Sequence, residues 1–273
     1  MGGSGPPLLL LHGYPQTHTI WHRVVPYLVE HFTVVVSDLR GYGDSSKPVG
    51  SPDHSNYSKR AMAQDQVELM AQLGFDSFYL AGHDRGGRVS HRLALDHPQR
   101  VKKLALLDIS PTLKMYQQTD MTFASAYYHW FFLIQPAPFP ETLIGAAPQV
   151  YLEKKMTLGS AGKAPFAPEA WAEYVRCFTP ETIHASCEDY RAAATIDLDH
   201  DRESIAKGQK IQCPLLVLWG QHGVIERCFK PLEDWAEVAA DVRGKALPGG
   251  HYLAEELPQQ TSSELIQFFK ERP

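Results

Sequence analysis

Short apolar runs alternate with segments of helical spacing along most of this chain of 273 residues. A continuous apolar run such as Leu8–Leu11 is typical of a strand that is buried on both faces of a parallel sheet. Strands that alternate with helices predict an α/β fold with a mostly parallel sheet flanked by helices, because right-handed crossovers join parallel strands. The predicted strands are Leu8–Leu11, Phe32–Val36, Phe78–Ala81, Val101–Leu107, Cys213–Trp219 and Gly244–Leu247, and the predicted core helices are Ser55–Leu73, Arg85–His97 and Glu255–Lys270.

The alternation stops between Thr112 and Gly208. These 97 residues contain fourteen of the 29 aromatic side chains, and an exposed surface segment would not be so enriched. We interpret residues 112–208 as a helical cap, inserted after the fourth predicted strand, whose apolar underside covers the sheet. Residues 1–111 and 209–273 then form the core domain.

Composition excludes several classes of protein. The chain has 26 basic and 31 acidic residues, a net charge of −5, whereas a nucleic-acid-binding protein needs a basic face. Its longest unbroken apolar run has five residues, and a membrane-spanning helix needs about 20. The four cysteines form no CxxC pair, and the N-terminus lacks the features of a secretion signal. We therefore expect a cytoplasmic protein that binds neither nucleic acid nor membrane.

The segment Phe78–Gly87 takes a strand directly into a helix through a turn flanked by Gly82 and Gly86. A turn of this kind exposes its central residue in a strained conformation, and in hydrolases of this architecture that residue is the nucleophile. The residue here is Asp84, and a carboxylate suits displacement at a saturated carbon, which gives an ester intermediate. For this pattern taken alone, the alternative is an aspartate that merely caps an ordinary helix.

Two further motifs complete a catalytic pattern. The first predicted strand ends in His12-Gly13-Tyr14, and the backbone N–H groups of Tyr14 and Arg85 are candidates for an oxyanion hole. Pro248–His251 lies between the last predicted strand and the last helix, where the catalytic histidine of such a fold lies. We assign His251 as the general base.

With these motifs in place, the sequence resembles the α/β-hydrolase fold and, more closely, the fluoroacetate and haloacetate dehalogenases, from Gly2 to Phe269. Related haloalkane dehalogenases and epoxide hydrolases usually carry tryptophan after the nucleophile, where this chain has Arg85. The resemblance implies that Arg85 and Arg88 bind the substrate carboxylate, and guanidinium groups do bind carboxylates through forked hydrogen bonds. For Arg88 alone, pairing with a surface acid is the alternative.

The acid that orients His251 has two candidates. Many α/β hydrolases place it after the strand Cys213–Trp219, where this chain has Gly223, with Glu226 as a possible substitute. The dehalogenases instead use an acid at the position of Asp108, at the end of the fourth predicted strand. The resemblance favours Asp108, although an aspartate at a strand end is more often a cap.

The resemblance also implies a halide site formed by His129, Trp130 and Tyr190. Tyr190 lies on the apolar face of a helix predicted to start near Thr179-Pro180, so periodicity alone points it inward. Without the resemblance, all three side chains would be interpreted as packing of the cap.

The N-terminus of this chain differs from the pattern of the dehalogenase family. Members of the family begin with a β-hairpin ahead of the first strand seen here, and this chain starts in what resembles the loop after that hairpin. The absent strands carry no catalytic residue. We expect the strand Phe32–Val36 to lie at an open edge of the sheet, with unpaired backbone groups.

Together these features predict an enzyme without metal or other cofactor that hydrolyses 2-haloacids such as fluoroacetate and chloroacetate. Its partner is a small anionic substrate, and the resemblance suggests a homodimer. An epoxide hydrolase with the same Asp84, His251 and Asp108 is the alternative on this fold. A non-catalytic receptor for a small ligand is an alternative of another class.

Overall fold

The computed structural model describes residues 1–160 and 165–271. Six strands form one sheet in the order β2-β1-β3-β4-β5-β6, and every neighbouring pair is parallel, which confirms the predicted fold class. The strands are β1 (Pro7–Leu11), β2 (Thr33–Ser37), β3 (Phe78–His83), β4 (Val101–Leu107), β5 (Leu215–Gly220) and β6 (Val242–Leu247). The core helices are η1 (His18–Trp21), α1 (Val25–Leu28), η2 (Ser55–Tyr57), α2 (Lys59–Gln72), α3 (Arg85–Asp96), α12 (Val224–Cys228), α13 (Pro231–Val238), α14 (Leu253–Glu256) and α15 (Pro258–Lys270).

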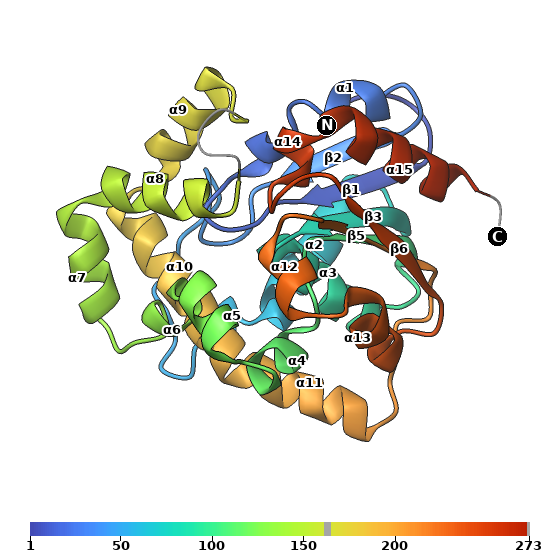
Figure 1. Ribbon diagram of the computed structural model, residues 1–273. Helices are drawn as coiled ribbons and strands as arrows, with labels where there is room; N and C mark the ends of the chain where they lie inside the picture. Colours follow the sequence, from blue (N-terminus) through green and yellow to red (C-terminus); the bar gives the residue numbers. More distant parts are fainter. Residues whose placement is uncertain (161–164, 272–273) are drawn as a thin grey trace.

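Alternate strand residues serve the two faces of the sheet. Leu8 and Leu10 of β1 pack in a cluster with side chains of α1 and α15, whereas Leu9 and Leu11 pack in a second cluster with side chains of α2 and α3. Figure 1 shows α1, α14 and α15 above the sheet in that view. Both faces are therefore covered, as the continuous apolar runs predict.

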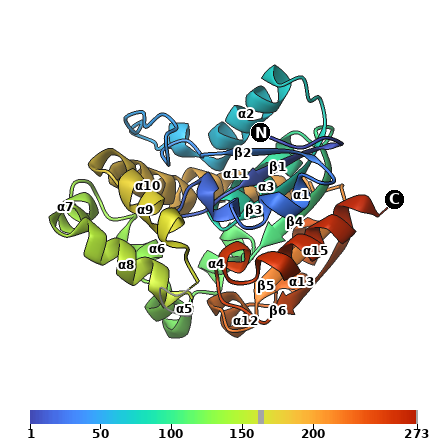
Figure 2. The same cartoon turned by 90° about the horizontal axis from the view of Figure 1, so that it is seen from above.

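The segment between β4 and β5 is helical. It contains α4 (Thr112–Gln117), α5 (Met121–Ala126), α6 (His129–Phe132), α7 (Phe139–Ala146), α8 (Pro148–Leu158), α9 (Pro168–Cys177), α10 (Pro180–Ala194) and α11 (Ile196–Ala206). Figures 1 and 2 show α7, α8 and α9 gathered to one side of the sheet. Their buried side chains, such as Leu152 and Tyr174, belong to the same cluster as Leu9 and Leu11 of β1, so this segment packs on the core rather than forming a separate unit. Of the predicted cap, residues 161–164 lie outside the described residues.

The strand β2 lies at the edge of the sheet, as predicted. The expectation of unpaired backbone groups on that edge is wrong at Val34, because its N–H and carbonyl oxygen pair with Gly2 in an isolated antiparallel bridge, at 2.8 and 3.0 Å. The predicted helix Glu255–Lys270 is wrong in extent, because it is divided into α14 and α15 at Leu257. Pro258 disfavours helical backbone in the residue before it, and Leu257 has φ −133° and ψ 53°. No helix in the described part of the chain is both long and apolar enough to span a membrane.

Candidate active site

The turn between β3 and α3 holds Asp84 in a strained backbone conformation, with φ 47° and ψ −114°. A Cβ at Gly82 would lie 2.5 Å from the carbonyl oxygen of Gly86, and a Cβ at Gly86 would lie 2.3 Å from the carbonyl oxygen of His12. The turn therefore closes only with glycine at both flanks. This is the physical reason for the motif that singled out Asp84 in the sequence.

The carboxylate of Asp84 is buried and lies between a backbone donor and a histidine. Its Oδ1 accepts a hydrogen bond of 2.9 Å from the backbone N–H of Tyr14, and its Oδ2 lies 3.9 Å from Nε2 of His251. Burial acts to raise the pKa of this carboxyl, but the nearby His251, together with Arg88 and Arg85, holds the pKa well below its usual value. Asp84 is therefore ionised, which is the form that a nucleophile needs.

His251 follows β6 and Asp108 follows β4, whereas Asp84 follows β3. All three therefore lie at the carboxyl ends of the parallel strands. The imidazole Nδ1 of His251 lies 2.5 Å from Oδ2 of Asp108. The other carboxylate oxygen accepts a hydrogen bond of 2.8 Å from the backbone N–H of Gly220. Glu226, the other candidate acid, instead accepts the indole N–H of Trp219. The structure therefore brings Asp84, His251 and Asp108 together.

Arg85 is fully buried, and its fork is engaged by a protein carboxylate that the sequence analysis did not identify. Nε and Nη2 donate to the two carboxylate oxygens of Asp189, at 2.9 and 2.6 Å. Asp189 also pairs with Lys59 and accepts the hydroxyl of Tyr42 at 2.6 Å. Within the described chain only Nη1 of this guanidinium lacks a partner, and the group lies 4.1 Å from the ring centroid of Tyr190. Arg85 therefore has little donor capacity left for a substrate.

Arg88 is also buried but has no carboxylate partner in the described chain. Nη1 donates to Oγ1 of Thr112 at 2.9 Å and to the carbonyl oxygen of Ser110 at 3.3 Å, and Nη2 contacts the sulfur of Met115 at 3.3 Å. Its Nε has no partner among the residues described, and the guanidinium lies 4.6 Å from the ring centroid of Trp130. Burial and the nearby Arg85 lower the pKa of this group. A buried cation with neutral partners is costly, and an anionic ligand would relieve that cost.

His129, Trp130 and Tyr190 lie close together above these arginines. The ring centroids of His129 and Tyr190 are 5.7 Å apart, and those of Trp130 and Tyr190 are 6.3 Å apart. The indole N–H of Trp130 and the hydroxyl of Tyr190 are buried without a hydrogen-bond partner in the described chain. Burial lowers the pKa of His129 well below its usual value, so this imidazole is neutral. A buried donor without a partner costs about 1–3 kcal/mol, so these two groups are candidates to bind an acceptor.

Sequence reasoning missed three residues of this site. One of them is Asp189, which directly precedes Tyr190. A buried arginine needs a counterion, and this need could have led to Asp189 as the partner of Arg85. Tyr127 places its hydroxyl 3.3 Å from Nδ1 of His251, and Lys155 is buried on α8. Neither of these two residues stands out in the sequence, because both lie in the cap, whose contacts with the core have no local pattern.

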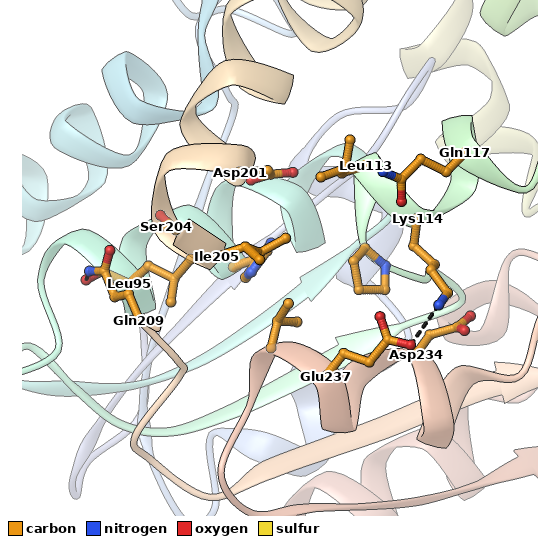
Figure 3. Close-up of a pocket in the computed structure, with 13 residues that line it drawn as sticks. Leu95, Leu113, Lys114, Gln117, Asp201, Ser204, Ile205, Gln209, Asp234 and Glu237 are labelled. Carbon is orange, nitrogen blue, oxygen red and sulfur yellow. Dashed lines mark hydrogen bonds and ion pairs between the residues drawn. The ribbon is translucent and has the colours of Figure 1, made fainter. Parts of the chain in front are cut away.

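A separate pocket lies between α3, α4, α11 and α13 (Figure 3). Its charged lining is mainly acidic, with Asp201, Asp234 and Glu237 against Lys114, which pairs with Glu237 at 2.6 Å. Burial raises the pKa of the Asp201 and Asp234 carboxyls. This lining disfavours an anionic ligand, and the pocket shares no residue with the site around Asp84.

Comparison with known proteins identifies the family. Residues 6–256 match the family described as alpha/beta hydrolase fold. The chain belongs to the alpha/beta hydrolase family. This hydrolase is 50% identical to a fluoroacetate dehalogenase of Burkholderia sp over 99% of its own length and 89% of the relative's. It is 36% identical to a soluble epoxide hydrolase of Corynebacterium sp. (strain C12), with coverage of 98% and 91%. The crystal structure of ALR0039 from Nostoc sp PCC 7120 superposes on the hydrolase with a TM-score of 0.97 at 60% identity, covering 99% of this chain and 93% of the other.

Proposed function

We propose that this hydrolase converts 2-haloacids such as fluoroacetate and chloroacetate into 2-hydroxyacids and halide through an ester on Asp84. One observation carries the proposal. Arg88 is a buried cation whose partners in the described chain, Ser110, Thr112 and Met115, are all neutral, so an anionic substrate would supply the counterion that it lacks. The 50% identity to the fluoroacetate dehalogenase of Burkholderia sp supports this chemistry.

In the first step, Arg88 holds the substrate carboxylate, with the free Nη1 of Arg85 as a further donor. A lone pair on Oδ2 of Asp84 forms a bond to the α-carbon, and the electron pair of the carbon–halogen bond leaves with the halide. The unpaired donors of Trp130 and Tyr190, together with the His129 ring, receive the halide.

In the second step, water attacks the carboxyl carbon of the Asp84 ester and gives a proton to Nε2 of His251. Asp108 holds the imidazole through Nδ1 and stabilises its charged form. The backbone N–H of Tyr14, already 2.9 Å from Oδ1, and that of Arg85 stabilise the oxyanion. The product alkoxide leaves and takes the proton from His251.

The experiment is a comparison of fluoroacetate, chloroacetate and styrene oxide with the same enzyme preparation. We expect halide release from both acids and none from Asp84→Asn. His251→Asn should alkylate but not hydrolyse, so mass spectrometry should find an adduct on the peptide that contains Asp84. In a single turnover in heavy-oxygen water, the label should enter Asp84 and not the product. An active enzyme that never carries the adduct or the label on Asp84 would overturn the mechanism.

Epoxide hydrolysis is the second candidate. The buried hydroxyl of Tyr190 has no acceptor in the described chain and is able to protonate an opened epoxide, and the soluble epoxide hydrolase of Corynebacterium sp. is 36% identical. Arg85 in place of the usual tryptophan, and the unpaired charge of Arg88, favour the haloacid. Diol from styrene oxide without halide from either acid would reverse this order.

We also propose that the protein is cytoplasmic and forms a homodimer. Cys177, Cys187, Cys213 and Cys228 are free thiols, which suits the reducing cytoplasm. The resemblance to the dehalogenases suggests a homodimer, and analytical ultracentrifugation of the purified chain tests it.

A further inference from the structure

Lys155, on α8, is a buried lysine that the proposed mechanism does not yet use. The residue is 6% exposed, and the contact of its ammonium within the described part of the chain is with the ring of Tyr14, not with a carboxylate or a carbonyl oxygen. The other two buried lysines of the described chain are satisfied. Lys59 pairs with Asp189, and Lys103 donates to the carbonyl oxygens of Phe268 and Glu271. A structural lysine at this burial would be paired in the same way.

The position of Lys155 relates it to one side of the active site. Its Nζ lies 5.7 Å from the ring centroid of Tyr14, within the range of a cation–π contact. The Tyr14 ring in turn stacks on the ring of His129 at 6.2 Å and meets Tyr190 edge-on at 5.3 Å. Lys155 therefore lies against a ring that contacts two of the three residues of the proposed halide pocket.

The charges of the active site indicate that the departing halide needs a nearby cation. When Asp84 forms its bond to the α-carbon, its negative charge passes to the halide, while the substrate carboxylate keeps its own charge. Arg85 is already matched by Asp189, and Arg88 is assigned to the substrate carboxylate. Both arginines lie against the proposed halide residues, at 4.1 Å from the Tyr190 ring and 4.6 Å from the Trp130 ring, but each is matched or assigned to another anion. Lys155 is then the buried cation left to balance the charge of the departing halide.

We propose that Lys155 is the counterion of the departing halide, a further specificity-determining residue of the proposed dehalogenase site. This proposal rests on the proposed function. Burial lowers the pKa of this ammonium to about 8, and the charge of Asp84 opposes that shift, so Lys155 is largely charged at neutral pH. Its charge is worth most for fluoride, the halide that is most strongly hydrated in water and the poorest leaving group.

Lys155→Met tests the proposal, with Lys154→Met as the matched control, because Lys154 is the exposed neighbour on the same helix. We expect Lys155→Met to lower kcat/KM for fluoroacetate by roughly ten- to a hundred-fold, since a charged interaction is lost. The loss for bromoacetate should be smaller, Lys155→Arg should retain part of the activity, and Lys154→Met should match the parent. Chloride and bromide, titrated against tryptophan fluorescence, should bind more weakly to Lys155→Met only.

Thermal unfolding separates this role from a structural one. Removing an unpaired buried charge should leave the melting temperature of Lys155→Met unchanged or higher, whereas loss of a structural lysine would lower it. Equal losses on fluoroacetate and bromoacetate, or unchanged halide binding, would overturn the role of Lys155 while halide release by the parent enzyme upholds the proposed function. A parent enzyme that releases no halide from any haloacid would instead overturn both proposals.

Discussion

The guanidinium of Arg85 is held by the carboxylate of Asp189 through two hydrogen bonds, from Nε to Oδ2 at 2.9 Å and from Nη2 to Oδ1 at 2.6 Å. Both side chains are fully buried, and Asp189 comes from cap helix α10. Of the two arginines predicted to bind the substrate carboxylate, one is therefore largely committed to the protein. We therefore propose Arg88 as the principal anchor of the substrate carboxylate, while Arg85 links the turn at Asp84 to the cap.

Asp189→Asn should destabilise the protein strongly. It leaves Arg85 buried without a counterion, which typically costs about 3–5 kcal/mol, whereas Lys59 keeps its ion pair with Asp197 at 3.4 Å. Urea unfolding measures this loss. The matched control is Asp199→Asn, whose pair with Arg202 is exposed and should contribute no more than about 1 kcal/mol. Equal stability of the two variants would contradict the role given to Asp189.

Arg88→Lys should lower kcat/KM for chloroacetate by roughly ten- to a hundred-fold, because the charge remains but the planar fork is lost. Arg202→Lys, at an exposed position, should leave the kinetics unchanged. Steady-state kinetics of both variants test the prediction. Parent-like values for Arg88→Lys would remove Arg88 from the site.

Asp108→Asn should slow hydrolysis of the ester more than its formation, because His251 loses the group that orients Nδ1. Rapid-quench measurements should then show a burst of halide followed by slow turnover. Glu226→Gln should show neither change, since Glu226 contacts Trp219. A burst in Glu226→Gln that is absent in Asp108→Asn would reverse the assignment.

Trp130→Phe should slow fluoride release more than chloride release. The substitution keeps much of the ring but removes an indole N–H that has no partner in the described chain. The donor matters more for fluoride, the poorer leaving group. Ion-selective electrodes measure both rates on one preparation, and an equal slowing of the two would mean that Trp130 packs the cap without holding halide.

Glu255→Gln should change how stability depends on pH. Burial raises the pKa of the Glu255 carboxyl to about 7, although the hydroxyl of Tyr174 and the charge of Arg23 oppose the shift. The folded protein therefore keeps a proton that the unfolded chain loses near pH ~4.3. Because the folded state binds more protons over this interval, this group makes stability fall as pH rises from that value through about 7, by at most about 4 kcal/mol.

Urea unfolding of the parent and of Glu255→Gln at several pH values between 5 and 8 checks this sign. The curve of the variant should be flatter, and its advantage over the parent should grow toward pH 8. Parallel curves would show that Glu255 does not titrate in this range.

The fold and the placement of Asp84 and His251 could be predicted from the sequence, whereas the choice of Asp108 over Glu226 came from the resemblance to the dehalogenases. Alternating apolar runs determine a parallel sheet, and the carboxyl ends of its strands meet at one edge, so residues that follow β3, β4 and β6 must converge there. Gly82 and Gly86 mark the nucleophile turn, because only glycine tolerates such close backbone contact. These are local or topological constraints, and a sequence carries them directly.

Only the tertiary structure decided which charges are matched. The partner of Arg85, the unpaired state of Arg88 and the position of Lys155 all depend on how the cap packs against the core. Arg85 and Asp189, like Lys155 and Tyr14, lie more than 100 residues apart in the sequence. Helical or strand periodicity relates only neighbouring residues, so no local sequence pattern predicts these contacts. The order of strands and turns along the chain determines where Asp84, Asp108 and His251 lie, and the packing of the cap on the core determines which charges surround them.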